Sequence, residues 1–148
     1  MIPDDYVESI TERLSLYQRL DNCENEEELQ SMAAEMKDRF GPLPQEVEDL
    51  FVTVRCRKLA VDLGFEKMSL KDETLRCYFI NRPDSPYFES QTFQQILSFI
   101  QTGTNKAKLK QSGKLFIMIV NEMKSMEEMH KFLSSMHKFV FTARTIKL

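Results

Sequence analysis

The spacing of apolar residues changes at Gly64, and this change restricts the fold classes that the chain can adopt. Up to Gly64, apolar residues recur every three or four positions, as on one face of an amphipathic helix. Beyond it, short runs rich in β-branched and aromatic residues predict strands. The strands come in local pairs, without the long crossover that parallel strands need. The sequence therefore predicts an α+β fold with a small antiparallel sheet.

Residues 1–64 predict three helices in succession. The first is expected to begin near Asp4 and Asp5, because acidic side chains favour a helix start. Its apolar stripe consists of Val7, Ile10, Leu14 and Tyr17, widened by Leu16 and Leu20. The second helix is expected to begin after the capping residue Asn25 and to end at Gly41.

The third helix is expected to begin with Pro44, whose missing N–H costs nothing in a first helical turn. Gly64 ends it, as a glycine commonly does after a last helical turn. Its apolar face consists of Val47, Leu50, Phe51, Val54 and Val61. The three helices together form the helical region of the predicted fold.

Two hairpins, each followed by a helix, are predicted after Gly64. The strands are 67–70, 74–80, 106–110 and 114–120, and the helices lie around 93–100 and 125–136. The last strand is apolar on both faces and should be central and well covered in the sheet. The tail 140–148 is compatible with a strand or with disorder. We expect residues 1–148 to form a single domain, in which residues 1–64 are helical and residues 65–148 form the α+β region.

Charge is unevenly distributed along the chain. Residues 1–50 contain 14 Asp and Glu against 4 Lys and Arg, a net charge of −10. Residues 51–148 contain 9 acidic and 16 basic residues, a net charge of +7. Such an asymmetry indicates charged partners, or an arrangement of the two regions against each other.

The sequence contains no motif for catalysis, a cofactor or a metal. The phosphate-binding glycine motifs and the G-x-S-x-G motif of hydrolases are absent. Cys23, Cys56 and Cys77 are widely spaced, which favours free thiols over a zinc site or disulfides. His130 and His137 are seven residues apart, too far for one ion on a helix, so we interpret them as solvated surface histidines.

The sequence also shows no membrane or export signal. No apolar run approaches the roughly 18 residues that a membrane span requires. The acidic start of the chain differs from the basic start of a signal peptide. We therefore expect a cytoplasmic protein without membrane contact.

A lysine cluster in the second half allows two interpretations. Lys106, Lys108, Lys110 and Lys114 could contact nucleic acid. The same alternation is typical of an exposed edge strand that is protected from aggregation by charge. The cluster has no interleaved aromatic residue, so we favour the edge strand. A nucleic-acid-binding module that uses basic residues of 51–148 remains the alternative function.

Glu35, Asp38 and Arg39 form a polar group on the second predicted helix. Glu35 and Asp38 are three residues apart and therefore neighbours on one face, whereas Arg39 is turned about 100° from Asp38. Spacing alone favours a surface salt-bridge patch, which contributes little to stability. The alternative is a docking surface for a basic partner.

The segment around these residues resembles a known family. Residues 35–44, E-M-K-D-R-F-G-P-L-P, are similar to the E-x-x-D-R-F-G-x-L-P segment of the C-terminal domain of the bacterial transcription-repair coupling factor. Ile2-Pro3 and the R-L-S-L-Y-Q-R-L run of residues 13–20 resemble that family too. The strong likeness covers residues 2–70, and no family motif is matched over residues 71–148.

The resemblance implies a non-catalytic regulatory domain. The parent family is an ATP-driven, helicase-like DNA translocase that displaces stalled RNA polymerase and recruits UvrA to nucleotide excision repair. Its C-terminal domain docks on the UvrB-like N-terminal module and masks the UvrA-binding surface, an autoinhibition. The resemblance places Glu35 and Asp38 at acidic positions expected to meet arginines of that module, with Arg39 beside them.

The same resemblance implies what the chain lacks. ATP and Mg²⁺ would bind only to the parent's motor, so no cofactor is expected for this chain, which would be an excised domain with Met1 as an expression start. RNA polymerase and UvrA would be indirect partners. Direct contact of this domain with nucleic acid is not expected from the family.

Overall fold

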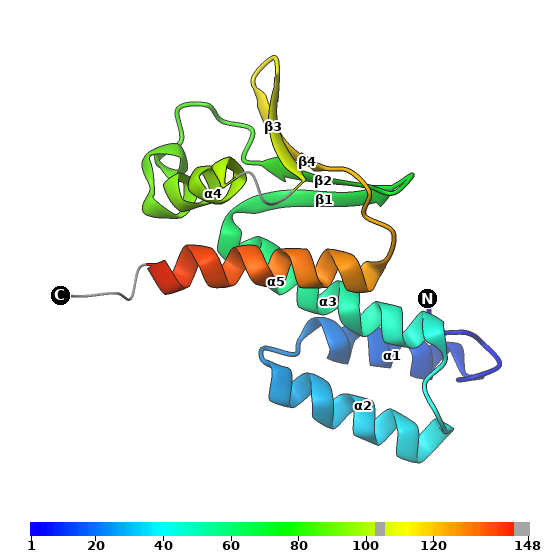
Figure 1. Ribbon diagram of the computed structural model, residues 1–148. Helices are drawn as coiled ribbons and strands as arrows, with labels where there is room; N and C mark the ends of the chain where they lie inside the picture. The colour runs from blue at the N-terminus through cyan, green and yellow to red at the C-terminus, as the bar shows by residue number, and fades with distance from the viewer. Residues whose placement is uncertain (103–105, 144–148) are drawn as a thin grey trace. The chain divides into compact units, whose positions relative to one another are not determined.

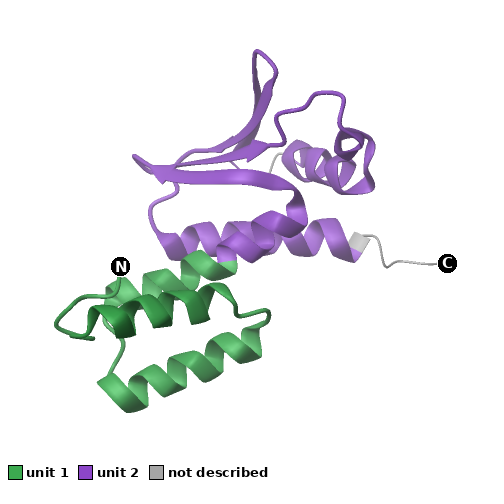
Figure 2. Cartoon of the chain, turned by 180° about the vertical axis from the view of Figure 1, so that it is seen from behind, with its two compact units in different colours: residues 1–55 green, residues 56–148 purple. Residues whose placement is uncertain are grey.

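The computed structural model describes residues 1–102 and 106–143, and the chain divides into two compact units (Figure 2). Unit 1 is Met1–Arg55 and unit 2 is Cys56–Leu148, so the division falls inside the third helix. The elements are α1 (Ile10–Asp21), α2 (Glu26–Phe40), α3 (Gln45–Leu63), β1 (Phe65–Lys71), β2 (Thr74–Phe79), the 3₁₀ helix η1 (Pro86–Glu89), α4 (Gln91–Gln101), β3 (Ala107–Ser112), β4 (Leu115–Val120) and α5 (Met126–Ala143). Figure 1 labels the α-helices and the strands. The predicted α+β class is confirmed.

Unit 1 contains α1, α2 and the first turns of α3 around one apolar core. The buried side chains are Ile2, Val7, Leu16, Leu20, Cys23, Leu29, Met32, Met36, Val47, Phe51 and Val54. The α2 positions recur at helical spacing, and Asn25 caps this helix by accepting a hydrogen bond from the Glu28 N–H at 2.8 Å. The predicted second helix is thus confirmed together with its start.

The predicted start of the first helix is wrong, and so are two positions of its predicted apolar stripe. Ser9, and not Asp4 or Asp5, caps α1 by accepting from the Glu12 N–H. Val7 lies in the turn before the helix, so counting the helical period from it shifts the stripe. Ile10 and Leu14 are consequently 67% and 59% exposed. The rest of the predicted stripe is confirmed, because Leu16 and Leu20 are buried in α1, Val7 is buried before it and Tyr17 packs on the core.

The joint between α2 and α3 is held by Tyr6. The Gly41 backbone has φ +92°, a left-handed conformation in which a side chain would be strained. The Tyr6 hydroxyl donates to the Gly41 carbonyl at 2.8 Å, and the Tyr6 ring lies 5.7 Å from that of Phe40. Pro44 is the residue just before α3, whereas the helix was expected to begin with it. Its carbonyl accepts a hydrogen bond from the Glu48 N–H at 3.1 Å, as the residue before a helix commonly does.

The end of the third helix carries a second correction. Val61, predicted on the apolar face, is 70% exposed, whereas Ala60 and Leu63 are buried. One residue along a helix rotates a side chain by about 100°, so Val61 leaves the face that its neighbours occupy.

Unit 2 is built on a four-stranded antiparallel sheet in the order β1-β2-β4-β3. The central position predicted for 114–120 is confirmed, because β4 lies between β2 and β3. The buried face of the sheet includes Leu75, Cys77 and Phe79 of β2 and Met118 and Val120 of β4. The expected coverage of both faces is wrong, since Ile117 and Ile119 on the opposite face are only partly buried.

The helices of unit 2 complete its core. Ser90 caps α4, and Ser125 caps α5 by accepting a hydrogen bond from the Glu128 N–H at 3.1 Å. Rings of α4 and α5 meet at Phe99 and Phe132, whose centroids are 5.8 Å apart. Residues 140–143 belong to α5, which corrects the predicted strand or disorder for them, and residues 144–148 lie outside the described residues. Among the described helices, none combines the length and apolar character that crossing a bilayer requires.

Gly64 and Gly41 allow a matched test of this packing. Both have a left-handed φ, but a Cβ on Gly64 would lie 2.2 Å from the Tyr87 ring, whereas one on Gly41 would meet nothing within 4 Å. The Tyr87 hydroxyl also donates to the Leu63 carbonyl at 2.5 Å, which fixes the ring there. We expect Gly64→Ala to destabilise the protein by about 2–4 kcal/mol and Gly41→Ala by about 1 kcal/mol in urea unfolding. Equal losses would contradict the contact with Tyr87.

Candidate docking surface on the second helix

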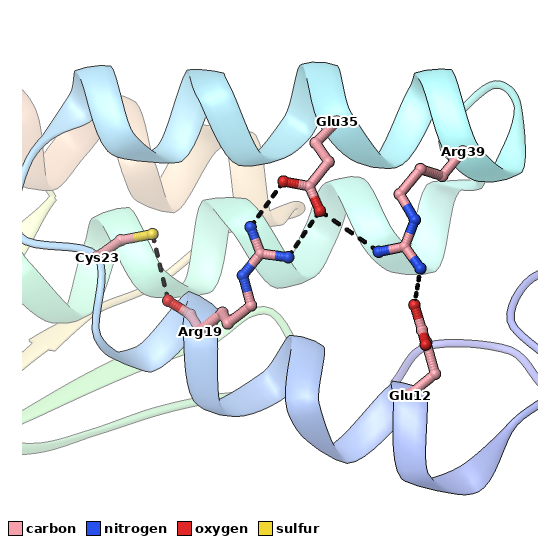
Figure 3. Close-up of polar contacts among 5 residues, drawn as sticks. All are labelled: Glu12, Arg19, Cys23, Glu35 and Arg39. Carbon is pink, nitrogen blue, oxygen red and sulfur yellow. Dashed lines mark hydrogen bonds and ion pairs between the residues drawn. The ribbon is translucent and has the colours of Figure 1, made fainter.

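Glu35 forms the centre of an ion-pair network between α1 and α2 (Figure 3). Arg19 of α1 donates to both carboxylate oxygens, with N–O distances of 2.7 and 2.8 Å. Arg39 of α2 donates to the same carboxylate at 3.4 Å. This two-pronged guanidinium geometry is the strongest form of side-chain ion pair. Glu35 is therefore engaged within unit 1.

Arg39 links the network to the start of α1. Its second terminal nitrogen pairs with Glu12, and its guanidinium lies 4.7 Å from the centroid of the Phe40 ring. Glu12, Arg19, Glu35 and Arg39, which we call the α1–α2 network, carry two positive and two negative charges. The charges within the network are therefore balanced.

Asp38 is the member of the predicted site that stays outside the network. Its side chain is exposed, and among the described residues it has no hydrogen-bond or ion-pair partner. The structure thus brings Glu35 and Arg39 together but leaves Asp38 directed to no internal cation. Its carboxylate is available to a partner.

The network keeps Glu35 ionised. The hydrogen bonds from Arg19, followed by its charge and by Arg39, lower the pKa of Glu35 from 4.5 to about 2. The same hydrogen bond raises the pKa of Arg19. Glu35 thus remains a carboxylate throughout the neutral and mildly acidic range.

An open groove of about 440 Å³ runs beside the Arg19–Glu35 pair. Its walls include Glu27, Glu28 and Ser31 of α2. Cys23 lines the same groove but is buried, and its thiol donates to the Arg19 carbonyl at 3.4 Å. A mixed polar wall of this kind suits contact with a charged partner more than catalysis.

Sequence reasoning missed the two residues of α1 that complete the network. Glu12 and Arg19 lie seven residues apart, two helical turns, and so face α2 at two heights. Arg19 belongs to the R-L-S-L-Y-Q-R-L run that resembles the coupling-factor family. That resemblance was the available signal, although it does not reveal the pairing.

The cysteines and His137 lie outside any arrangement that suits catalysis or metal binding among the described residues. No group of three possible metal ligands occurs among the described residues. All three cysteines are buried free thiols, and burial raises the pKa of Cys56 to about 11, so that it is unreactive. His137 is not the solvated histidine we predicted, because its Nε2 lies 2.8 Å from the Asp62 carboxylate of α3 and its ring packs on Phe141.

The predicted lysine cluster lies on and around β3, an edge strand as the favoured interpretation requires. Lys106 pairs with Glu122 at 2.9 Å. Lys108 and Lys110 are exposed on the strand itself, and Lys114 follows the turn at Gly113. Protection of an edge therefore accounts for their place along β3.

Removal of Arg19 should release the Glu35 carboxylate. We expect Arg19→Gln to raise the pKa of Glu35 from about 2 toward 4.5, because the largest cause of the lowering is lost. In the wild type, the network stabilises the fold at pH above 4.5, and its contribution falls as pH decreases toward 2. The carboxyl ¹³C shift of Glu35, followed by NMR during acid titration, measures this change. An unchanged midpoint in Arg19→Gln would show that Arg19 does not hold the carboxylate.

Comparison with known proteins gives a consistent result. A family model described as the TRCF domain matches residues 1–90. The transcription-repair-coupling factor of Rickettsia conorii is 35% identical over 114 residues, which is 77% of this chain and 10% of the relative. That of Escherichia coli is 37% identical over 68 residues, 46% of this chain and 6% of the relative.

The fold agrees with these sequence matches. A crystal structure of the C-terminal domain of a transcription-repair coupling factor matches with a TM-score of 0.75, covering 95% of this chain and 85% of that one at 16% identity. The chain spans about one tenth of the length of the relative from Rickettsia conorii. Because the family model matches more than half of this chain, the chain belongs to the TRCF domain family.

Proposed function

We propose that this chain is a non-catalytic regulatory domain of a cytoplasmic transcription-repair coupling factor. In this proposal it docks on the UvrB-like N-terminal module of the same protein and masks the surface that recruits UvrA. The observation that carries the proposal is the exposed Asp38 carboxylate beside the α1–α2 network, in a chain of the TRCF domain family.

The network supports docking by fixing the surface. Glu35 and Arg39 hold each other and both reach α1, so the face around Asp38 needs little ordering when a partner binds. A preorganised surface loses less conformational entropy on association. Arg19 already donates a hydrogen bond to each carboxylate oxygen of Glu35. Each oxygen has a second lone pair, so Glu35 can accept only a further, weaker contact at the rim of the groove. Asp38 therefore supplies the main attraction in this proposal, and Glu35 and Arg39 position it.

The proposed partner surface carries arginines. A carboxylate and a guanidinium form two parallel hydrogen bonds, which gives geometric specificity. The excess of 14 acidic over 4 basic residues in residues 1–50 would also attract a basic surface at longer range. Both contributions should weaken as salt rises.

The activity of the whole parent protein belongs to the same proposal. A relative in which the matched segment makes up only 10% of the length has room for a motor, and ATP and Mg²⁺ would bind there. The motor would move on DNA, displace RNA polymerase and release the masked surface for UvrA. This domain would regulate that exposure without chemistry of its own.

Asp38→Asn provides the test of docking. We expect it to weaken binding to the UvrB-like module by about 1–2 kcal/mol, or about 5- to 30-fold in Kd, because one charge pair is lost. Isothermal titration calorimetry at low and physiological salt measures the effect, and the difference from wild type should shrink at higher salt.

Glu48→Gln is the matched control for that experiment. Glu48 is an exposed carboxylate on α3, so its removal changes the net charge equally without touching α2. We expect it to leave Kd within about twofold. Docking would lose its proposed basis if wild type failed to bind the module, or if both substitutions weakened binding equally.

A further inference from the structure

The outer face of the unit 2 sheet gathers basic residues from all of its strands except the apolar β4. Strand register places partners on the same face, so the sheet can be followed row by row. One row consists of Lys110, Ile117, Tyr78 and Lys67, and the next of Lys108, Ile119, Arg76 and Ser69. Lys71, paired with Thr74, extends the same face. We call the residues of these rows the outer sheet face.

The outer sheet face carries five positive charges and no negative one. None of Lys67, Lys71, Arg76, Lys108 and Lys110 forms an ion pair with a described residue. The acidic residues nearest in sequence, Glu66, Asp72 and Glu73, lie at the bulge of β1 and in the β1–β2 turn. Edge protection requires charge only on an edge strand, so it does not explain Arg76 on the inner strand β2.

An aromatic ring lies among these charges. Tyr78 is partly buried on the inner strand β2, and the Lys67 amine lies 5.1 Å from the centroid of its ring. Ile117 and Ile119 beside it are partly buried on the central strand. The outer sheet face therefore combines cations with a flat apolar surface. The spacing of the lysines along β3 does not reveal this combination, because the ring and the isoleucines come from other strands.

We propose that the outer sheet face binds single-stranded nucleic acid. The five cations would contact phosphates, and a phosphate held by Lys67 would bring its neighbouring base to Tyr78. Aromatic rings stack on bases of any sequence, and cationic grooves or faces follow the backbone. Unpaired bases fit a flat sheet, whereas the stacked bases of a duplex offer it only their edges. This site is independent of the proposed docking of α2.

Fluorescence anisotropy with labelled oligothymidine and oligouridine tests the site and distinguishes DNA from RNA. For five phosphate contacts, we expect log K to fall with log salt with a slope of about −3.5. Lys108→Gln with Lys110→Gln should make the slope shallower by about 1.4. Tyr78→Leu should weaken binding at least about fivefold while leaving the slope unchanged, because it removes stacking without charge.

Lys131→Gln with Lys138→Gln is the matched control. Both lysines are exposed on α5, outside the sheet, so the pair changes the net charge equally and should leave the slope unchanged. Circular dichroism and light scattering show whether each variant remains folded and monodisperse. The proposal is overturned if wild type does not bind at about 50 mM salt, or if the control variant reduces the salt slope as much as Lys108→Gln with Lys110→Gln. It is also overturned if a duplex of the same length binds more tightly than the single strand, or if polyglutamate binds equally tightly.

Discussion

A carboxylate held between two guanidinium groups joins the first two helices of unit 1, and the candidate docking surface is arranged around it. Glu35 receives Arg19 from one helix and Arg39 from its own, and Arg39 continues to Glu12. Exposed ion pairs contribute little to stability singly, but a network orders several long side chains at once. Its main effect here is positional, because it leaves Asp38 as the carboxylate that faces outward.

The D-R-F-G-P-L-P segment is explained largely by local structure. Arg39 packs on Phe40, Phe40 contacts Tyr6, and Gly41 adopts a left-handed backbone that only glycine accepts easily. The helix end at Gly41 was predictable, and the start of α3 to within one residue of Pro44, because capping and proline chemistry are local. The contacts from Tyr6 and Glu12 were not, since they join residues far apart in sequence. A motif can therefore be specific to a family while most of its residues shape a joint.

The same distinction between local and distant contacts holds for α1 and for the sheet. Counting from Val7 wrongly placed Ile10 and Leu14 on the apolar stripe of α1, because the turn before Ser9 interrupts the helical period. In unit 2, alternation along β3 indicated an edge strand. The outer sheet face appears only once the register sets Lys110 in line with Ile117, Tyr78 and Lys67. Strand pairing was predicted within each hairpin, whereas the contact of β2 with β4 required the folded structure.

The two surfaces make different demands on a partner, and backbone NMR can separate them. Addition of the unlabelled UvrB-like module to labelled protein should shift amide signals in the C-terminal half of α2 and in the α1 residues that face it. The signals of β1–β4 should stay in place. Shifts confined to the sheet, with α2 unaffected, would contradict docking through the Asp38 face.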